Sequence, residues 1–317
     1  MILSTLLLLC GFVTVILGAE GLVRGASSLG VLLKVPQIVI GLTVVAFGTS
    51  TPELVVNLFS SVEGHGGIVF GNVIGSNLMN LLFILGLTAA IKPLLIRKHS
   101  LRIEIPLSLL ATLLLAFLVN DRMGGPDETN LLSRTDGLVL LTLFGVFLGY
   151  THWISSRGEA AESGEVKTYS IWLSLLMIAG GLAGLVLGGR LVVDKAVLLA
   201  EALGVSQKVI GLTIVAVGTS LPELATSVVA ALKGHSDIAV GNVVGSNIFN
   251  LLLILGISGL IRPAAYDLSF NTDLVLLSLA TLLLIGLAWI KPRRKFNRLK
   301  GWVFVSLYIV YLVWLVS

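Results

Sequence analysis

The chain contains an internal duplication. Residues 35–93 recur as residues 205–263, at a constant offset of 170 positions, with 32 identities in 59 aligned positions and no gap. Each copy places one glutamate, Glu53 or Glu223, in a stretch that is otherwise apolar. A duplicated pair of polar, glycine-interrupted segments in an apolar chain is the pattern that best indicates the substrate site of a secondary transporter. The duplication therefore predicts a pseudo-twofold arrangement with both glutamates near its centre.

The composition is typical of a protein that spans a membrane several times. Of the 317 residues, 56% are hydrophobic and 12% are charged, whereas about 25% of residues are charged in a soluble domain. The pI near 9.3 does not indicate nucleic-acid binding, because the basic residues lie mainly between apolar segments, where loop charge sets membrane orientation. We therefore expect an all-α polytopic membrane protein whose partner is the lipid bilayer and not a nucleic acid.

Ten segments are long and apolar enough to cross a bilayer as helices. They are residues 2–23, 37–60, 68–91, 101–119, 136–154, 170–190, 207–231, 238–261, 272–290 and 299–316. A polar connection, residues 155–168, divides the chain into residues 1–154 and 169–317, with five spans each. Because five is odd, the second half must enter the membrane from the opposite side. The sequence thus predicts ten transmembrane helices arranged as two inverted five-helix repeats.

The lysine and arginine residues predict the orientation. With the N-terminus outside, the inner loops and adjoining span ends hold 15 of the 21 basic residues, and the outer side holds six. Six of the 15 belong to the single loop Lys291–Lys300. The positive-inside rule then places both termini on the extracytoplasmic side of the cell (inner) membrane and the connection at 155–168 in the cytoplasm.

The repeated motif GTS-x-PE predicts a break in a membrane helix. Pro52 donates no backbone hydrogen bond, and its ring clashes with the carbonyl four residues earlier. The helix should kink or unwind near residues 46–50 and free carbonyl oxygens, which at mid-membrane is tolerated only where the backbone lines a cavity. Thr49 and Ser50 precede Glu53 by four and three residues, so we expect them on its helical face. The second copy repeats the arrangement with Ala216, Thr219, Ser220, Pro222 and Glu223.

The repeated motif GN-x-x-GSN adds small residues and polar oxygens. Gly71 and Gly75 form a small-xxx-small pair that allows another helix to approach closely. Ser76 and Asn80 are spaced i, i+4 and share one helical face. The second copy supplies Gly241, Gly245, Ser246 and Asn250. Four further amides lie on other faces and fit packing and binding equally well: Asn72, Asn77, Asn242 and Asn247. The predicted centre contains only oxygen ligands, which suit calcium or sodium and match zinc or copper poorly.

These motifs resemble the two alpha-repeats of the sodium/calcium exchanger family, within the cation/calcium exchanger superfamily. The resemblance covers both repeats and the ten-span plan, and it is nearest to the prokaryotic branch that consists of the transport core alone. It implies a non-enzymatic antiporter that exchanges Ca²⁺ for Na⁺, with no cofactor and with three Na⁺ replacing one Ca²⁺. The connection at 155–168 is too short for the calcium-sensing domains of animal exchangers. We expect the chain to function as a monomer.

The resemblance also implies four central cation sites. The calcium ligands would be Glu53 and Glu223 with the backbone carbonyls of Thr49 and Thr219. The sodium ligands would be the same glutamates with Ser50, Ser76, Ser220, Ser246 and the carbonyls of Ala46 and Ala216, while Asn80 and Asn250 would complete the middle site. Some relatives, including the potassium-dependent branch, carry an aspartate in place of Asn250, so potassium co-transport is not expected here. Proton/calcium exchangers usually carry glutamate at the positions of Asn80 and Asn250.

The charge at such a centre favours exchange. Two carboxylates about 5 Å apart repel each other by about 3 kcal/mol at an effective dielectric constant near 20, so the empty site must take up cations or protons. One Ca²⁺ or several Na⁺ neutralise both charges, and shared ligands make the two loads mutually exclusive. The first and sixth spans are less polar, and we expect them to slide across the core to switch access by alternating access.

Three alternatives remain at this point. A proton/calcium antiporter would use the same core with a different coupling ion. A cation channel would use similar ligands, but broken helices in inverted repeats favour alternating access. An intramembrane hydrolase would need a base for its serine, and the four histidines lie at span ends or in loops. They are His65, His99, His152 and His235.

Overall fold

The computed structural model describes residues 2–120, 130–156, 167–202, 216–290 and 294–316. The regular secondary structure of this part is helical apart from four two-residue strands. The first half contains α1 (Ile2–Leu32), α2 (Gln37–Ile40), η1 (Gly41–Val45), α3 (Ala46–Thr49), α4 (Thr51–Glu63), α5 (Gly66–Leu78), η2 (Met79–Ile84), α6 (Leu85–Ile91), α7 (Lys98–Arg102), α8 (Glu104–Leu118) and α9 (Arg134–Ser156). The second half contains α10 (Ile171–Ala202), α12 (Ala216–Thr219), α13 (Leu221–Leu232), α14 (Ser236–Ile248), η5 (Phe249–Ile254), α15 (Leu255–Ile261), α16 (Phe270–Trp289) and α17 (Arg298–Val316). The elements η1, η2 and η5 are π-helical. The predicted all-α class is confirmed.

Among the described residues, eight helical runs are long and apolar enough to cross a membrane, or nine when the bent pair of residues 37–49 and 51–63 counts as one span. The apolar helix α13 is shorter, and much of the predicted seventh span, residues 207–231, lies outside the described residues. The ten-span plan therefore stays a prediction. The predicted connection at 155–168 also falls largely outside the described part.

The first and sixth spans are longer than the sequence predicts. α1 continues to Leu32 rather than ending at residue 23, and α10 continues to Ala202 rather than residue 190. A count of apolar residues stops near the charges of Glu20 and Arg24, but these two side chains pair with each other one helical turn apart. The rest of this turn is buried, with Leu22 and Ala26 fully covered. Packing thus extends α1 beyond its most apolar stretch.

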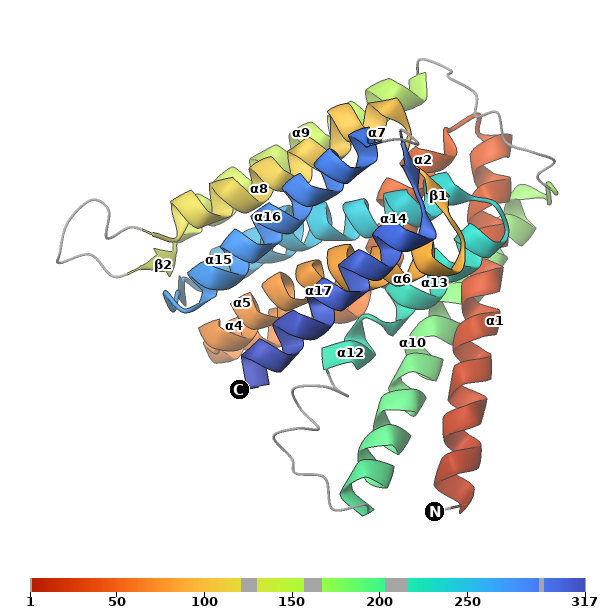
Figure 1. Cartoon of the computed structure of the whole chain (residues 1–317), viewed down its shortest axis with the longest axis horizontal. Coiled ribbons are helices and arrows are strands. Elements are labelled where there is room, and N and C mark those ends of the chain that lie inside the picture. Colours follow the sequence, from red (N-terminus) through yellow and green to blue (C-terminus); the bar gives the residue numbers. More distant parts are fainter. Residues whose placement is uncertain (1, 121–129, 157–166, 203–215, 291–293, 317) are drawn as a thin grey trace.

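Two helical runs form the centre of the described part of the molecule. The runs Gly66–Ile91 and Ser236–Ile261 have 72% and 78% of their most apolar windows buried, whereas the other six runs have 28–39%. In Figure 1, α8, α9 and α16 lie along one edge of the body, and α1 and α10 project from the opposite corner. The two spans that carry the GN-x-x-GSN motifs are therefore surrounded by the other spans, which leave more of their surface for lipid.

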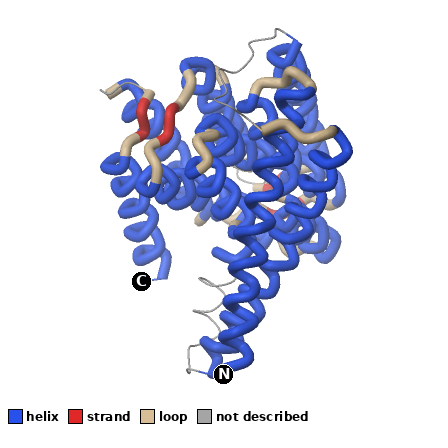
Figure 2. The backbone as a smooth tube through the Cα atoms, turned by 90° about the vertical axis from the view of Figure 1, so that its right-hand side faces the viewer, coloured by secondary structure: helices blue, strands red, loops and turns tan. Residues whose placement is uncertain are grey.

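α1 and α10 pack side by side with their backbones in contact. A Cβ atom added to Gly18 would lie 2.8 Å from the carbonyl oxygen of Gly181, and one added to Gly188 would lie 3.0 Å from that of Gly11. Only glycine permits this approach, which is typical of tightly packed membrane helices. Figures 1 and 2 both show the two helices as a joined pair that extends beyond the rest of the body.

Two short antiparallel pairings join loops from the two halves. β1 (Leu94–Leu95) pairs with β4 (Lys295–Phe296), and β2 (Leu131–Leu132) pairs with β3 (Ala264–Ala265). β1 and β3 occupy equivalent places after the duplicated segment, at the offset of 170. Each sheet thus pairs a strand that follows a duplicated segment with a strand that precedes an outer helix of the other half. β1 pairs with β4 before α17, and β3 pairs with β2 before α9.

Candidate functional site

The predicted helix break is present in both repeats. The helices over residues 37–49 and 51–63 meet at 49°, and Ser50 leaves the helical region with φ −82° and ψ 8°. Ser220 has nearly the same backbone angles, φ −93° and ψ 8°. A proline follows two residues later in each copy, at the start of α4 and α13. The kink predicted from the proline is therefore confirmed at Ser50.

Each break places a glutamate in the first turn of the following helix. Glu53 lies in the first turn of α4, Glu223 lies in the first turn of α13, and both side chains are 1% exposed. The N-terminal turn of a helix presents unpaired backbone N–H groups and the positive end of the helix dipole, so it favours a carboxylate.

The two glutamates are bonded across the repeats. Ser50 Oγ donates to Glu223 Oε1 at 3.0 Å, and Ser220 Oγ donates to Glu53 Oε1 at 3.3 Å. Ser50 has non-helical backbone angles at the break, and its hydroxyl bonds the glutamate of the other repeat. The two breaks consequently build one site rather than two.

The backbone oxygen at the first break is not free. The Ala46 carbonyl accepts the Ser50 N–H at 3.0 Å and lies 3.3 Å from Thr49 Oγ1. Thr49 Oγ1 also lies 3.0 Å from Asn242 Oδ1. The prediction that the break frees this carbonyl is therefore corrected. The Ala46 oxygen accepts the backbone N–H of Ser50, and the hydroxyl of Thr49 lies beside it. In the second copy, Thr219 lies in α12 and makes an interaction of its own.

Other predicted positions lie at the edge of the described part. Ala216 is the first residue of α12, and its surroundings are outside the described residues. The equivalents of η1, residues 211–215, are outside them as well.

The small-xxx-small pairs of the two copies differ in how closely other segments approach them. A Cβ added to Gly245 would lie 2.8 Å from the Leu42 carbonyl oxygen, which confirms close approach for the second copy. Among the described residues, Gly71 meets only Phe270, and nothing lies close to Gly75.

The remaining predicted ligands lie on the two central spans. Asn80 belongs to η2 and Asn250 to η5, and both are 1% exposed; Ser76 and Ser246 are also buried. The sequence analysis did not anticipate π-helical turns here. Such turns occur as short insertions in α-helices, frequently at functional sites.

Five buried oxygens of this set have no hydrogen-bond partner in the part of the chain that the structure describes. They are Glu53 Oε2, Glu223 Oε2, Asn80 Oδ1, Asn250 Oδ1 and Ser246 Oγ. An unsatisfied buried polar group costs about 1–3 kcal/mol, so native proteins rarely keep several together without a ligand. Four of the five are equivalent atoms in the two repeats. The described residues hold no cluster of three or more His, Cys, Asp and Glu side chains, so the acceptors are two carboxylates, two amides and a hydroxyl.

Asparagines whose roles the sequence left open hold the glutamate helices in place. Asn72 Nδ2 donates to the Glu53 carbonyl at 3.2 Å and to Asn57 Oδ1 at 2.6 Å. Asn242 Nδ2 donates to the Glu223 carbonyl at 3.2 Å. The signal available in the sequence was the identical spacing of 19 residues between glutamate and asparagine in both copies.

A second pair of amides joins the central spans. Asn77 Nδ2 donates to the Asn247 carbonyl at 3.3 Å, and Asn247 Nδ2 donates to the Asn77 carbonyl at 3.4 Å. Asn77 Oδ1 also accepts from Asn250 Nδ2 at 3.0 Å, which orients the amide of Asn250. These bonds fix the two spans against each other across the pseudo-twofold relation.

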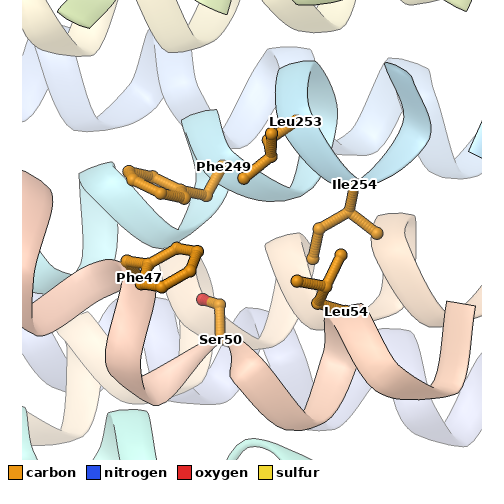
Figure 3. A pocket seen from close by; sticks show the side chains of 6 residues that line it. All are labelled: Phe47, Ser50, Leu54, Phe249, Leu253 and Ile254. Carbon is orange, nitrogen blue, oxygen red and sulfur yellow. The ribbon is translucent and has the colours of Figure 1, made fainter. Parts of the chain in front are cut away.

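A narrow apolar hollow lies beside Ser50 (Figure 3). The rings of Phe47 and Phe249 lie on one side of it, with centroids 5.8 Å apart, and Leu54, Leu253 and Ile254 line the rest. The hollow leads to the hydroxyl that bonds Glu223.

Membrane-length helices packed around broken segments with buried oxygen acceptors define a transporter-type membrane protein. The chain belongs to the sodium/calcium exchanger protein family, whose model matches residues 3–153 and 173–317. The predicted family is confirmed, and the chain is a cation/calcium exchanger in this class, a membrane transporter.

Relatives and solved structures match over nearly the whole chain. Inner membrane protein YrbG of Escherichia coli K12 is 36% identical over 91% of this chain and 90% of its own. Sodium/calcium exchanger MaX1 of Methanosarcina acetivorans is 33% identical over 97% of both chains. The structure of the sodium-calcium exchanger NCX_Mj soaked with 10 mM Na⁺ and zero Ca²⁺ superposes with a TM-score of 0.82, at 34% identity over 98% of both chains. These matches support a location in a membrane.

Proposed function

We propose that the chain exchanges Ca²⁺ for Na⁺ across the cell membrane by alternating access, at one site between the two helix breaks. The observation that carries the proposal is the group of five unpartnered buried oxygens, defined above, around the two cross-bonded glutamates. Hard cations prefer oxygen ligands of this kind. Mutual exclusion of Ca²⁺ and Na⁺ then follows from shared ligands.

The proposed ligands are the side chains and carbonyls that the sequence indicated, with one adjustment. They are Glu53, Glu223, Ser50, Ser220, Ser76, Ser246, Asn80 and Asn250, with the carbonyls of Thr49, Thr219, Ala46 and Ala216. The Ala46 carbonyl accepts the Ser50 N–H and lies 3.3 Å from the Thr49 hydroxyl, so a cation at this oxygen would displace that hydroxyl. Oxygens that exchange a hydroxyl donor for a cation suit a site that must load and unload.

We propose that residues 1–154 and 169–317 form two inverted five-helix repeats, joined by a cytoplasmic connection at 155–168 with both termini outside. Reciprocal contacts support the arrangement: serine to glutamate in both directions and asparagine to backbone in both directions. The close contact between α1 and α10 implies that these helices move together as the sliding element.

The decisive test uses ⁴⁵Ca²⁺ uptake into proteoliposomes. Three Na⁺ that run down a tenfold gradient release about 4 kcal/mol, which is enough for about 1,000-fold Ca²⁺ accumulation without a membrane potential. We expect uptake only when Na⁺ is loaded inside. A proton gradient of the same size should leave uptake at the background level, because Asn80 and Asn250 stand where proton/calcium exchangers usually carry glutamate. Uptake that follows the proton gradient and ignores Na⁺ would identify a proton/calcium antiporter instead.

Removing a supporting amide should weaken Ca²⁺ binding without abolishing transport. Asn242→Ala breaks the bonds to the Glu223 carbonyl and to Ser227 Oγ. Loss of a residue that orients a metal ligand typically costs about 10–100-fold in affinity, so we expect the Ca²⁺ concentration at half-maximal uptake to rise about tenfold. The matched control is Asn120→Ala, which removes an amide pair with Asn271 away from the site. Equal losses in both variants would contradict the role of Asn242.

A further inference from the structure

Three charged side chains meet where α1 passes the end of α13. Lys233 Nζ donates to Glu20 Oε1 at 2.8 Å, and Arg24 forms an ion pair with the same carboxylate oxygen. The side chains of Lys233 and Glu20 are 27% and 33% exposed, so the pair is only partly open to solvent. α1 also packs along α13. The ion pair therefore joins the projecting helix pair to the helix that carries Glu223.

Each of these positions carries the opposite charge in the other repeat. At the offset of 170, Glu20 corresponds to Arg190, Arg24 to Asp194 and Lys233 to Glu63. Two other charged positions of the duplicated segment keep their sign, Lys92 with Arg262 and Glu53 with Glu223, whereas Lys208 and Asp237 have the uncharged equivalents Ile38 and Gly67. Inverting all three signs at once keeps every attraction within the group. Surface charges without a joint role would achieve this only by chance.

The second group is not assembled in this structure. Glu63 lies at the end of α4, 3.2 Å from His65 Nδ1, and both are more than half exposed. Arg190 is exposed on α10 and forms no ion pair with any residue that the structure describes. Within the same part of the chain, α10 does not pack along α4 as α1 packs along α13. One of two equivalent contacts is thus made while the other is open.

We propose that the two groups are alternating latches. The Glu20–Lys233 pair holds α1 against α13 in the access state described here, and Arg190 pairs with Glu63 to hold α10 against α4 in the opposite state. The inference rests on the proposed alternating-access exchange, in which inverted repeats swap their conformations. Because α1 and α10 are in backbone contact, a movement that closes one latch opens the other.

The inverted signs have a physical use. Lys233 beside Arg190, or Glu63 beside Glu20, would be a repulsive pair, so each latch can close only with its own helix. Partly exposed ion pairs change an equilibrium by at most about fivefold. Such a contact is strong enough to bias an access state and weak enough to break in every cycle.

The test measures distances between spin labels by pulsed electron paramagnetic resonance in lipid nanodiscs. One label is on Cys10, the only cysteine of the chain, which is exposed on α1, and the other is on Leu299→Cys at the exposed start of α17. We expect two distance populations. Glu20→Lys or Lys233→Glu should shift their ratio about fivefold away from the state described here. The double variant of Glu20→Lys with Lys233→Glu should restore the wild-type ratio.

The second latch gives the opposite shift. Arg190→Glu should raise the population of the state described here, and Arg190→Glu combined with Glu63→Lys should cancel that change. Glu20→Gln serves as a milder variant if a charge reversal impairs folding, with a smaller shift in the same direction. Populations that do not move, or that move in the same direction for both latches, would overturn the proposal. The distances require no transport, so a wild type without Na⁺-dependent uptake would refute the proposed function while the latch result still stands by itself.

Discussion

Glu53→Gln and Glu223→Gln should each abolish Na⁺-dependent ⁴⁵Ca²⁺ uptake. Both side chains are buried, and each has one carboxylate oxygen bonded by a serine of the other repeat and one oxygen without a partner among the described residues. Glutamine keeps the shape but removes one of two negative charges. Truncating one partner of a buried charge interaction costs about 2–5 kcal/mol, so we expect Ca²⁺ affinity to fall by about 100-fold or more.

The near-identical surroundings of the two glutamates make this prediction specific. The two variants should lose ⁴⁵Ca²⁺ uptake to a similar degree, because both carboxylates are needed to neutralise the bound Ca²⁺. The matched control is Asp267→Asn, which removes one negative charge from an exposed position in the loop before α16. It should leave uptake close to that of the wild type. Normal uptake in either glutamine variant would show that the ions are bound elsewhere.

Gly181→Ala should separate the two projecting helices. A Cβ atom at this position would lie 2.5 Å from the backbone nitrogen of Leu22 and 2.7 Å from the carbonyl oxygen of Gly18. Backbone atoms cannot move aside as a flexible side chain can, and overpacking costs about 1–3 kcal/mol. We expect a lower melting temperature in detergent and loss of most exchange, because α1 and α10 must move as a unit.

The neighbouring residue provides the control. Gly180 is exposed, and nothing in the described part of the chain lies within 4 Å of a Cβ added there. Gly180→Ala should therefore melt at or above the wild-type temperature, since alanine favours a helix by about 1 kcal/mol over glycine. If Gly181→Ala melted and exchanged like Gly180→Ala, the close packing of α1 on α10 would be incorrect.

Much of the site could be predicted because the relevant physics is local. Pro52 lacks a backbone donor, so the break near Ser50 follows from covalent structure whatever surrounds it. A glutamate in an apolar span is costly, and its recurrence at an equivalent position indicates a common role. The amide and hydroxyl positions followed from helical spacing, which holds as long as the segment stays helical.

Other features depend on contacts between distant segments. Helical spacing predicted Ser50 on the face of Glu53, but it could not predict that the Ser50 hydroxyl bonds Glu223, because this bond depends on how the two repeats pack. The Ala46 carbonyl is bonded by a neighbouring hydroxyl whose orientation depends on Asn242 of the other repeat. The extra length of α1 depends on burial, with Gly25 against α10 and Gly30 against α2, which a count of apolar residues does not register.

The sequence by itself determined the membrane class, the duplication, the two breaks and the residue types of the site, because these follow from composition, covalent geometry and internal repetition. Only the tertiary structure decided how the repeats meet. In the tertiary structure, each serine at a break donates a hydrogen bond to the glutamate of the other repeat. Five buried oxygens of the site have no partner among the described residues. One of the two charge-inverted ion pairs, Lys233 with Glu20, is formed, and the other is not. These are properties of packing between segments about 170 positions apart, and local sequence carries no distance information at that range.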